Sequence, residues 1–167
     1  TMKKKLHIIL FIIFNIIFAG LIKPENNSIL NYTHILFEWE QLSGADSYQI
    51  QISSDDNFYN IVTDTIDSSL KYIEKNNINW SNDYYWRIRP IYNNNPIDVW
   101  SDYFSFETNS QISNASSQIY LDNQYSDGVT IFGAFFDYFS AIIDKNGNEI
   151  WNTGSNDIVY YTTDLRS

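Results

Sequence analysis

The chain has 167 residues, of which 44% are hydrophobic and 17% aromatic, and its formal net charge at pH 7 is −10. This length accommodates one domain of typical size and part of another. A strongly acidic chain repels phosphate backbones, which argues against nucleic-acid binding. Because the sequence contains no cysteine, disulfides, thiolate nucleophiles and cysteine-based metal sites are excluded. The abundance of isoleucine and aromatic residues favours β-strands.

Residues 1–20 have the pattern of a secretory signal peptide. Three lysines are followed by an apolar run from Leu6 to Phe18, which matches the charged and apolar regions of such a leader. The apolar run is shorter than the about 20 residues that a membrane span needs. We therefore expect an exported protein (periplasmic, cell-surface or extracellular) that meets the membrane only through this leader. An uncleaved N-terminal anchor is the alternative interpretation.

Residues 24–108 predict a small β-sandwich within an all-β chain. Short segments such as 48–52 and 84–88 alternate apolar and polar side chains, which is typical of half-buried strands. Polar turns separate these segments, and no helical period is sustained. The final strand is expected over 99–108. The side chains expected in the sandwich core are Trp39, Tyr48, Ile50, Tyr84, Trp86, Ile88, Trp100 and Phe104.

Residues 35–108 resemble a fibronectin type III domain of the kind common in bacterial exported proteins. Trp39, in "FEWEQLSGADSYQIQISSDDNF", has the place of the family's core tryptophan. Ile78 and Tyr84 have the spacing of its leucine and its corner tyrosine, whose hydroxyl bonds to the backbone upstream. Trp80 stands where the family usually has a proline. The family's first strand is not recognisable, so we expect it to be short or poorly paired.

Surface positions of the predicted sandwich suggest a docking module rather than a catalyst. Tyr59, Tyr85 and Tyr103 are expected to form cross-strand pairs on outer sheet faces. Stacking on a sugar or on a protein partner is the alternative for these three rings. Arg87 and Arg89 are expected to form cross-strand ion pairs, which contribute little to stability when they are exposed.

Residues 109–118 are polar and rich in serine and asparagine, which predicts a linker. In residues 119–167 the pattern changes, because "GVTIFGAFF" is apolar on both alternating faces, as in a strand covered on both sides. Asn146-Gly147 predicts a tight hairpin turn, and Trp151 is expected in the core. Propeller blades are small sheets packed on both faces, so this region predicts the first strands of a truncated β-propeller. A second small sandwich or a sorting module is the alternative.

The segment "DGVTIFGAFFDYFSAIIDKNGNEIW" resembles the entry strands of the bacterial arylsulfotransferase family. Its hairpin half is shared with other propellers, including those that bind quinone cofactors. The resemblance implies sulfuryl transfer from aryl sulfates to small phenolic substrates, through a histidine near the propeller axis and without a nucleotide cofactor. The residues that match the family pattern are Gly128, Thr130, Asp144, Gly147 and Trp151.

No catalytic, cofactor-binding or metal-ligating residue is predicted within this chain. His7 lies in the leader and His34 precedes the Trp39 strand, so neither histidine falls in the propeller-like part. Asp55, with the two residues after it, predicts a solvated turn, because no spaced run of oxygen ligands for Ca²⁺ follows. No cofactor is expected.

The sequence as a whole predicts the N-terminal part of an exported arylsulfotransferase-like protein, with its active site outside this chain. The competing hypothesis is a non-catalytic secreted or cell-surface adhesion or binding protein. In that case the sandwich would bind a protein or a glycan partner.

Overall fold

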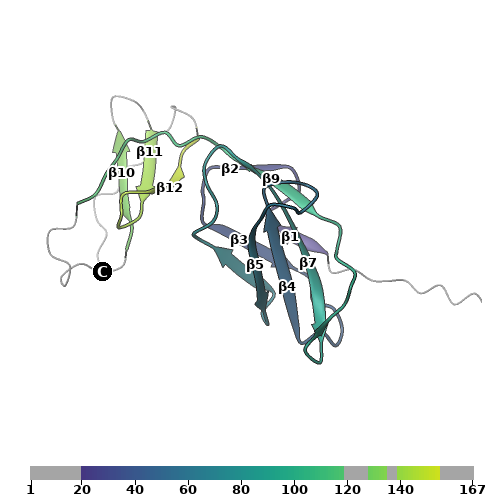
Figure 1. Cartoon of the computed structure of the whole chain (residues 1–167). Coiled ribbons are helices and arrows are strands. Elements are labelled where there is room, and N and C mark those ends of the chain that lie inside the picture. Colours follow the sequence, from purple (N-terminus) through teal and green to yellow (C-terminus); the bar gives the residue numbers. More distant parts are fainter. Residues whose placement is uncertain (1–19, 119–127, 135–138, 155–167) are drawn as a thin grey trace, which may run out of the picture.

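The computed structural model describes residues 20–118, 128–134 and 139–154, and every regular element in these ranges is a β-strand (Figure 1). The predicted signal peptide lies almost entirely outside the described residues. Among the described residues, no helix has the length and apolar character to cross a membrane. The strands form three sheets, two in a sandwich and one in a separate C-terminal part.

The first sheet of the sandwich has three antiparallel strands in the order β1-β3-β6. They are β1 (Leu21–Lys23), β3 (Ile35–Trp39) and β6 (Lys71–Glu74). The second sheet has the order β2-β9-β7-β4-β5, with the short β8 paired to β7. In this sheet only the β2–β9 pair is parallel. Its strands are β2 (Ser28–Leu30), β4 (Ser47–Ser53), β5 (Ile61–Asp67), β7 (Asp83–Tyr92), β8 (Asn95–Pro96) and β9 (Phe104–Thr108).

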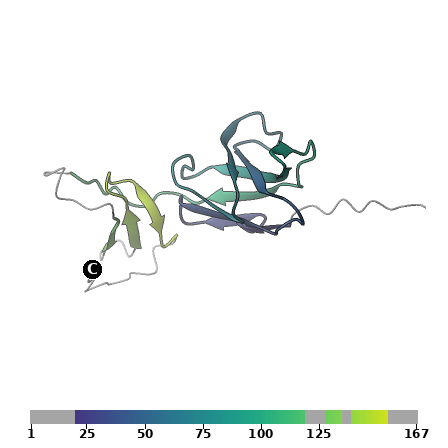
Figure 2. The same ribbon diagram turned by 90° about the horizontal axis from the view of Figure 1, so that it is seen from below.

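This strand order defines a fibronectin type III-like β-sandwich of the immunoglobulin-like fold class. The two sheets lie face to face, as Figure 2 shows from below. Alternate residues of β3, β4 and β7 point inward, which is the period-2 pattern that the sequence predicted. The Phe37 ring meets the Trp86 ring edge-on across the sheets, with 5.1 Å between the ring centroids. The large side chains that are almost completely buried are Ile35, Phe37, Trp39, Tyr48, Ile50, Ile52, Trp86, Ile88 and Phe106.

Of the expected core residues near the end of the sandwich, Phe104 is only partly buried and Trp100 lies outside the core. The last strand begins at Phe104 rather than at Val99, and Phe104 is half-buried at the edge of the core. Trp100 precedes the strand and lies on the outer face, where the guanidinium groups of Arg87 and Arg89 stack on its ring. This segment is attached to β7 by isolated hydrogen bonds instead of a continuous ladder, so its side chains do not follow the alternation of β9.

The first strand of the sandwich is divided between the two sheets. β1 pairs with β3, the chain turns at Pro24, and β2 then pairs with β9 in the other sheet. Proline has no backbone N–H to give to a ladder, so the pairing changes at this residue. The sandwich therefore starts at Leu21, before the expected boundary at residue 24, with two strands of three residues each.

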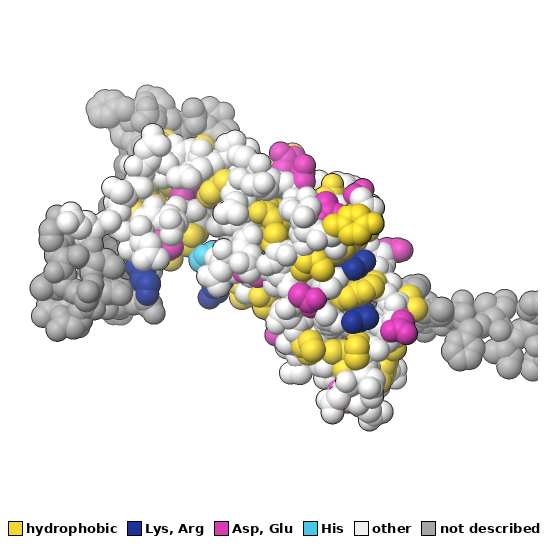
Figure 3. Space-filling model, in the orientation of Figure 1, with side chains coloured by type: hydrophobic (Ala, Val, Ile, Leu, Met, Phe, Trp, Pro, Cys, Tyr) yellow, Lys and Arg dark blue, Asp and Glu magenta, His cyan; other side chains and the backbone are white. Residues whose placement is uncertain are grey.

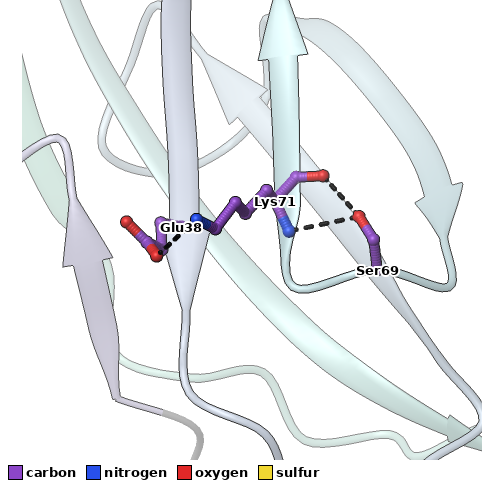
Figure 4. A network of polar contacts seen from close by, with 3 residues as sticks. All are labelled: Glu38, Ser69 and Lys71. Atoms are coloured by element: carbon purple, nitrogen blue, oxygen red, sulfur yellow. Dashed lines mark hydrogen bonds and ion pairs between the residues drawn. The ribbon is translucent and has the colours of Figure 1, made fainter.

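The strands β5 and β6 were not predicted from the sequence. Both are edge strands in which side-chain type does not follow burial, because Ile66 and Ile73 are exposed whereas Thr63 and Glu74 are buried. The turn between them is held by the Ser69 hydroxyl, which donates to the Lys71 carbonyl at 2.6 Å and accepts from the Lys71 N–H at 3.2 Å. The ammonium group of Lys71 lies 3.3 Å from the Glu38 carboxylate on β3 (Figure 4). This exposed pair fixes register more than it stabilises the fold.

A buried carboxylate joins the two sheets at one edge. Glu74 is 2% exposed, and its oxygens accept hydrogen bonds from Thr63 on β5 at 2.6 Å and from the Tyr72 hydroxyl at 3.0 Å. The backbone N–H groups of Asn76 and Asn77 donate to it as well. Burial acts to raise the pKa of Glu74, but the hydrogen bonds outweigh it and leave the pKa below its ordinary value. Burial and the adjacent carboxylate raise the pKa of Tyr72 to about 12.

Two buried tyrosines each accept a hydrogen bond from the backbone upstream. The N–H of Asn79 donates to the Tyr84 hydroxyl at 2.9 Å, which is the bond of the corner tyrosine that the resemblance implies. The N–H of Leu42 donates to the Tyr48 hydroxyl at 2.6 Å. In both cases the ring fills the core while its polar end satisfies a loop N–H group.

We expect Trp39→Ala to lower the free energy of unfolding of the chain by about 3–5 kcal/mol, because it empties a large core position. Trp39→Phe should cost less, since it keeps an aromatic ring and removes an indole N–H that has no hydrogen-bond partner in the described structure. Urea unfolding measures both changes. Tyr59→Ala is the control, because Tyr59 is 86% exposed; equal losses for Trp39→Ala and Tyr59→Ala would contradict the core assignment.

The stability of the sandwich should fall as the pH rises from 10 to about 12. Tyr72 loses its proton near its ordinary pKa of 10.0 when the chain is unfolded, but only at about 12 in the fold. Protonated Tyr72 therefore favours the folded state below pH 10, and this contribution is lost as the pH rises through the folded pKa. Urea unfolding at several alkaline pH values measures the slope. Tyr72→Phe should flatten it relative to the unaltered chain, and an unchanged slope would contradict the assignment.

Candidate functional site

The C-terminal sheet consists of three antiparallel strands in the order β10-β11-β12. They are β10 (Thr130–Ala134), β11 (Phe139–Ile143) and β12 (Glu149–Asn152). The predicted hairpin turn lies between β11 and β12. Asp144 organises it, because its carboxylate accepts the N–H groups of Asn146 and Asn148, each at 2.8 Å.

The strand β12 is joined directly to the sandwich through its backbone. The N–H of Thr33 donates to the Ile150 carbonyl at 3.0 Å, and the N–H of Asn152 donates to the Asn31 carbonyl at 3.0 Å. Between these bonds, Tyr32 pairs with Trp151 as an antiparallel bridge. The connection from β2 to β3 therefore acts as one further short strand on the edge of the C-terminal sheet.

A second buried carboxylate lies at this junction. Glu149 is 3% exposed, and it accepts the N–H of Ser113 at 2.7 Å, the N–H of Ile112 at 3.1 Å and the Asn152 side-chain amide at 2.7 Å. The same Asn152 amide donates to the Ser110 carbonyl at 3.0 Å. Residues 109–118, predicted as a linker, are thus tied to the start of β12.

Two further contacts hold the linker and the hairpin in place. The Trp80 indole N–H on the sandwich donates to the Glu149 carbonyl at 2.8 Å. Gly147 in the hairpin turn has a φ of +87°, and a Cβ atom there would lie 2.6 Å from the backbone nitrogen of Ser117. A larger residue at position 147 would therefore be strained and would also collide with the linker.

A groove with a volume of about 600 Å³ lies between the sandwich and the hairpin. Figure 3 shows a hollow between the two parts of the molecule, with a histidine side chain, coloured cyan, at its edge. Sites for small ligands usually have volumes of about 300–1,000 Å³. The side chains of the groove that can form hydrogen bonds or stack on a ligand include His34, Lys75, Asn79, Trp80, Asp144 and Asn148.

The charges of the groove influence one another. Burial and the nearby ammonium of Lys75 lower the pKa of His34, whereas Asp144 acts in the opposite direction. Burial acts to raise the pKa of Asp144, but hydrogen bonds from Asn148 and Asn146 hold it below its ordinary value. At neutral pH the imidazole of His34 is therefore neutral, and the groove is also lined by the Lys75 ammonium and by the carboxylates of Asp144 and Glu149. The sequence predicts no role for His34, whereas the structure places it at this junction.

The outer face of the larger sheet carries interleaved arginine and aromatic side chains. Arg87 lies over the Phe58 ring at 3.8 Å and over the Trp100 ring at 4.4 Å, and the Tyr85 and Tyr103 rings meet edge-on at 5.6 Å. The three tyrosines were expected in cross-strand pairs, but Tyr103 directly precedes β9 and Tyr59 lies in the loop between β4 and β5. The Tyr85–Tyr103 contact is therefore a ring contact beside the β7–β9 ladder, in which Tyr85 stands opposite Ser105.

Arg87 and Arg89 do not form the ion pairs that the sequence predicted. They donate instead to the side-chain carbonyls of Gln51 and Gln49, respectively. The reason is that glutamines, not acidic residues, stand opposite them in the β4–β7 register.

The residues that carried the arylsulfotransferase resemblance have structural roles within the described part of the chain. Asp144 and Gly147 form the turn, and Trp151 is half-buried in the bridge to Tyr32. β11 buries Ala141 and Ile143, but β10 is not covered on both faces by the described residues. Phe135 and Phe136, part of the two-sided apolar pattern, lie outside these residues.

The described residues contain no group of three acidic or histidine side chains close enough to hold a metal ion. Asp55, the first residue of the predicted turn, accepts the N–H groups of Asn57, Tyr59 and Asn60. Its carboxylate therefore shapes the loop. Sequence reasoning missed the functional potential of Lys75, Asn79 and Glu149, because nothing in their neighbourhood along the chain indicates that they meet.

Comparisons with known proteins define neither a family nor a function for this chain. No family model matches the chain, and no curated protein matches its sequence. The fibronectin type-III domain of human fibronectin type III domain containing protein 3 is 16% identical, with a TM-score of 0.44, over 56% of this chain and 86% of that one. The alpha-L-rhamnosidase from Dictyoglumus thermophilum is 14% identical, with a TM-score of 0.41, over 71% of this chain and 15% of the rhamnosidase. Similarity at these scores supports no argument about activity, and the strand order defines the fold.

Glu149→Gln should loosen the junction without unfolding the sandwich. The substitution replaces one acceptor oxygen with an NH₂ group, which then faces a donor, and a buried unsatisfied group of this kind costs about 1–3 kcal/mol. Hydrogen exchange of the full chain should show faster exchange at Ile112 and Ser113, with β4 and β7 unchanged. Glu107→Gln on exposed Glu107 is the matched control. Unchanged exchange at Ile112 and Ser113 would mean that Glu149 does not hold the linker.

Proposed function

We propose that the sandwich of this chain is a structural adaptor that holds the next domain of a larger exported protein in a fixed orientation. The observation that carries this proposal is the two-way backbone pairing of Asn31 and Thr33 with β12. Strand addition of this kind fixes both the direction and the register of the added strand. A simple tether would leave the two parts free to reorient.

The buried Glu149 carboxylate supports the adaptor role. A carboxylate that is removed from water must keep its hydrogen-bond donors, and two of these donors belong to the linker. Moving the C-terminal sheet away from the linker would leave this carboxylate with the Asn152 amide of its own strand and without the N–H groups of Ile112 and Ser113. The junction is therefore held by an electrostatic requirement as well as by backbone pairing.

For the larger protein, we propose that the domain begun by β10, β11 and β12 is an arylsulfotransferase-like propeller. Support comes from Gly128, Thr130, Asp144, Gly147 and Trp151, which match the family pattern. The three antiparallel strands agree with the start of a blade. The proposed reaction breaks the bond between sulfur and the phenolic oxygen of an aryl sulfate and forms a new one to a phenol. Its active site would lie outside this chain, because His7 and His34 both precede β10.

Export is part of the same proposal. The three lysines and the apolar run of residues 1–20 support it. Export would place the protein in the periplasm, on the cell surface or outside the cell.

A second candidate is a non-catalytic adhesion or binding protein, in which the sandwich contacts a protein or a glycan. One observation favours it, namely the aromatic outer face, on which Tyr59 is 86% exposed and Tyr103 is 46% exposed. Exposed tyrosines provide large contact areas at low entropic cost. In this case the junction would only space the binding face from the rest of the protein.

The full-length protein that contains this chain should transfer sulfate from 4-nitrophenyl sulfate to phenol. Release of 4-nitrophenol together with formation of phenyl sulfate, followed by absorbance and mass spectrometry, measures the reaction. The 167-residue chain alone is the control and should be inactive. A folded full-length protein that forms no phenyl sulfate would reject the proposed chemistry. The adaptor role would then still be judged separately, by the hydrogen exchange of Glu149→Gln.

A further inference from the structure

The groove between the sandwich and the hairpin has hydrogen-bonding groups that the protein itself does not use. The His34 imidazole, the Lys75 ammonium and the side-chain amides of Asn76 and Asn79 all line it. Within the described part of the chain, none of these four groups makes a hydrogen bond to another protein group. They come from two loops of the sandwich, before β3 and after β6, so only the fold brings them together.

The hairpin wall of the groove is already fixed before any ligand binds. The Asp144 carboxylate accepts two backbone N–H groups on one oxygen and the Asn148 side-chain amide on the other, at 2.9 Å. The Trp80 indole N–H is used by the Glu149 carbonyl. The polar atoms of both residues are thus held in place, and Trp80 contributes its ring to the groove. A preorganised wall reduces the entropy lost when a ligand binds.

The charged groups of the groove offer little to an ionic ligand. Lys75 is the one cationic side chain of its lining, and it is opposed by the carboxylates of Asp144 and Glu149. The oxygens of both carboxylates already accept hydrogen bonds within the protein. Burial and Lys75 lower the pKa of His34, so its ring is neutral at neutral pH and has one donor and one acceptor. An anion would therefore meet a surplus of negative charge, and a cation would find the carboxylate oxygens already in use.

We propose that this groove binds a neutral carbohydrate of one or two sugar rings. Sugar hydroxyls donate and accept hydrogen bonds, and the asparagine amides and the neutral imidazole do the same. The apolar face of a sugar ring can pack on Trp80, and the volume of about 600 Å³ accommodates a ligand of this size. This site is independent of the proposed sulfuryl transfer and separate from the aromatic outer face.

The test is an NMR titration of the full ¹⁵N-labelled chain with maltose, cellobiose, lactose and chitobiose, and separately with inorganic sulfate. We expect at least one disaccharide to shift the backbone signals of His34, Asn79 and Asn148 and the indole signal of Trp80, with saturation at millimolar concentration. Asn79→Ala should weaken this binding about fivefold, the effect of one lost hydrogen bond. Its amide spectrum reports that the variant is folded. Tyr59→Ala should bind as the unaltered chain does.

Three results would overturn the proposal. The first is that none of the four disaccharides shifts the groove signals of the unaltered chain. The second is that sulfate shifts them and the sugars do not, which would make the groove an anion site. The third is that sugars shift Tyr59, Tyr85 and Tyr103 instead, which would assign binding to the outer face. None of these results bears on the phenyl sulfate assay, so the two proposals fail independently.

Discussion

The buried carboxylate of Glu149 is the constraint on which the junction depends. Removing a carboxylate from water is unfavourable unless several donors replace the lost water, and here the donors are two linker N–H groups and the Asn152 amide. Because these donors lie on two segments, satisfying one carboxylate ties the linker to β12. The edge of the sandwich is joined to the same strand by the backbone bonds of Asn31 and Thr33 and by the Trp80 indole.

Within the sandwich, Glu74 is a second buried carboxylate whose lost water is replaced by several hydrogen-bond donors. That carboxylate is also buried, and it is surrounded by hydroxyl and N–H donors rather than by a lysine or an arginine. A chain with 20 acidic and 10 basic side chains cannot pair every carboxylate with a cation. Neutral donors replace the missing cations. Where the donor is a backbone N–H, as at Asn76 and Ser113, the hydrogen bond also holds the segment that contains it. The arginines serve a different purpose, since Arg87 and Arg89 stack on aromatic rings of the outer face.

The sequence predicted those parts of the fold in which neighbouring residues determine the outcome. Alternation in β4 and β7 placed Ile50 and Trp86 inside, and Asn146-Gly147 located the hairpin turn, because φ above zero is readily adopted there. The edge strands β5 and β6 were missed, since their exposed positions include Ile66 and Ile73 and their buried ones Thr63 and Glu74, so apolar and polar residues do not mark the two faces. The sequence wrongly predicted that Trp100 lies in the core. Trp100 precedes the start of β9, so the alternation of inward and outward side chains in that strand does not determine which face of the sheet its ring lies on.

The sequence by itself determined an all-β chain, the strand periodicity of the sandwich, the polar composition of residues 109–118 and the tight turn at Gly147. Only the tertiary structure decided that the linker docks on β12, that Asn31 and Thr33 extend the C-terminal sheet, and that His34, Lys75 and Asp144 face one groove. The physical reason is range. Periodicity and turn preference act between residues close in the chain. The hydrogen bond from Ser113 to Glu149 and the pairing of Tyr32 with Trp151 join positions that are distant in the chain, so only the folded structure brings them together.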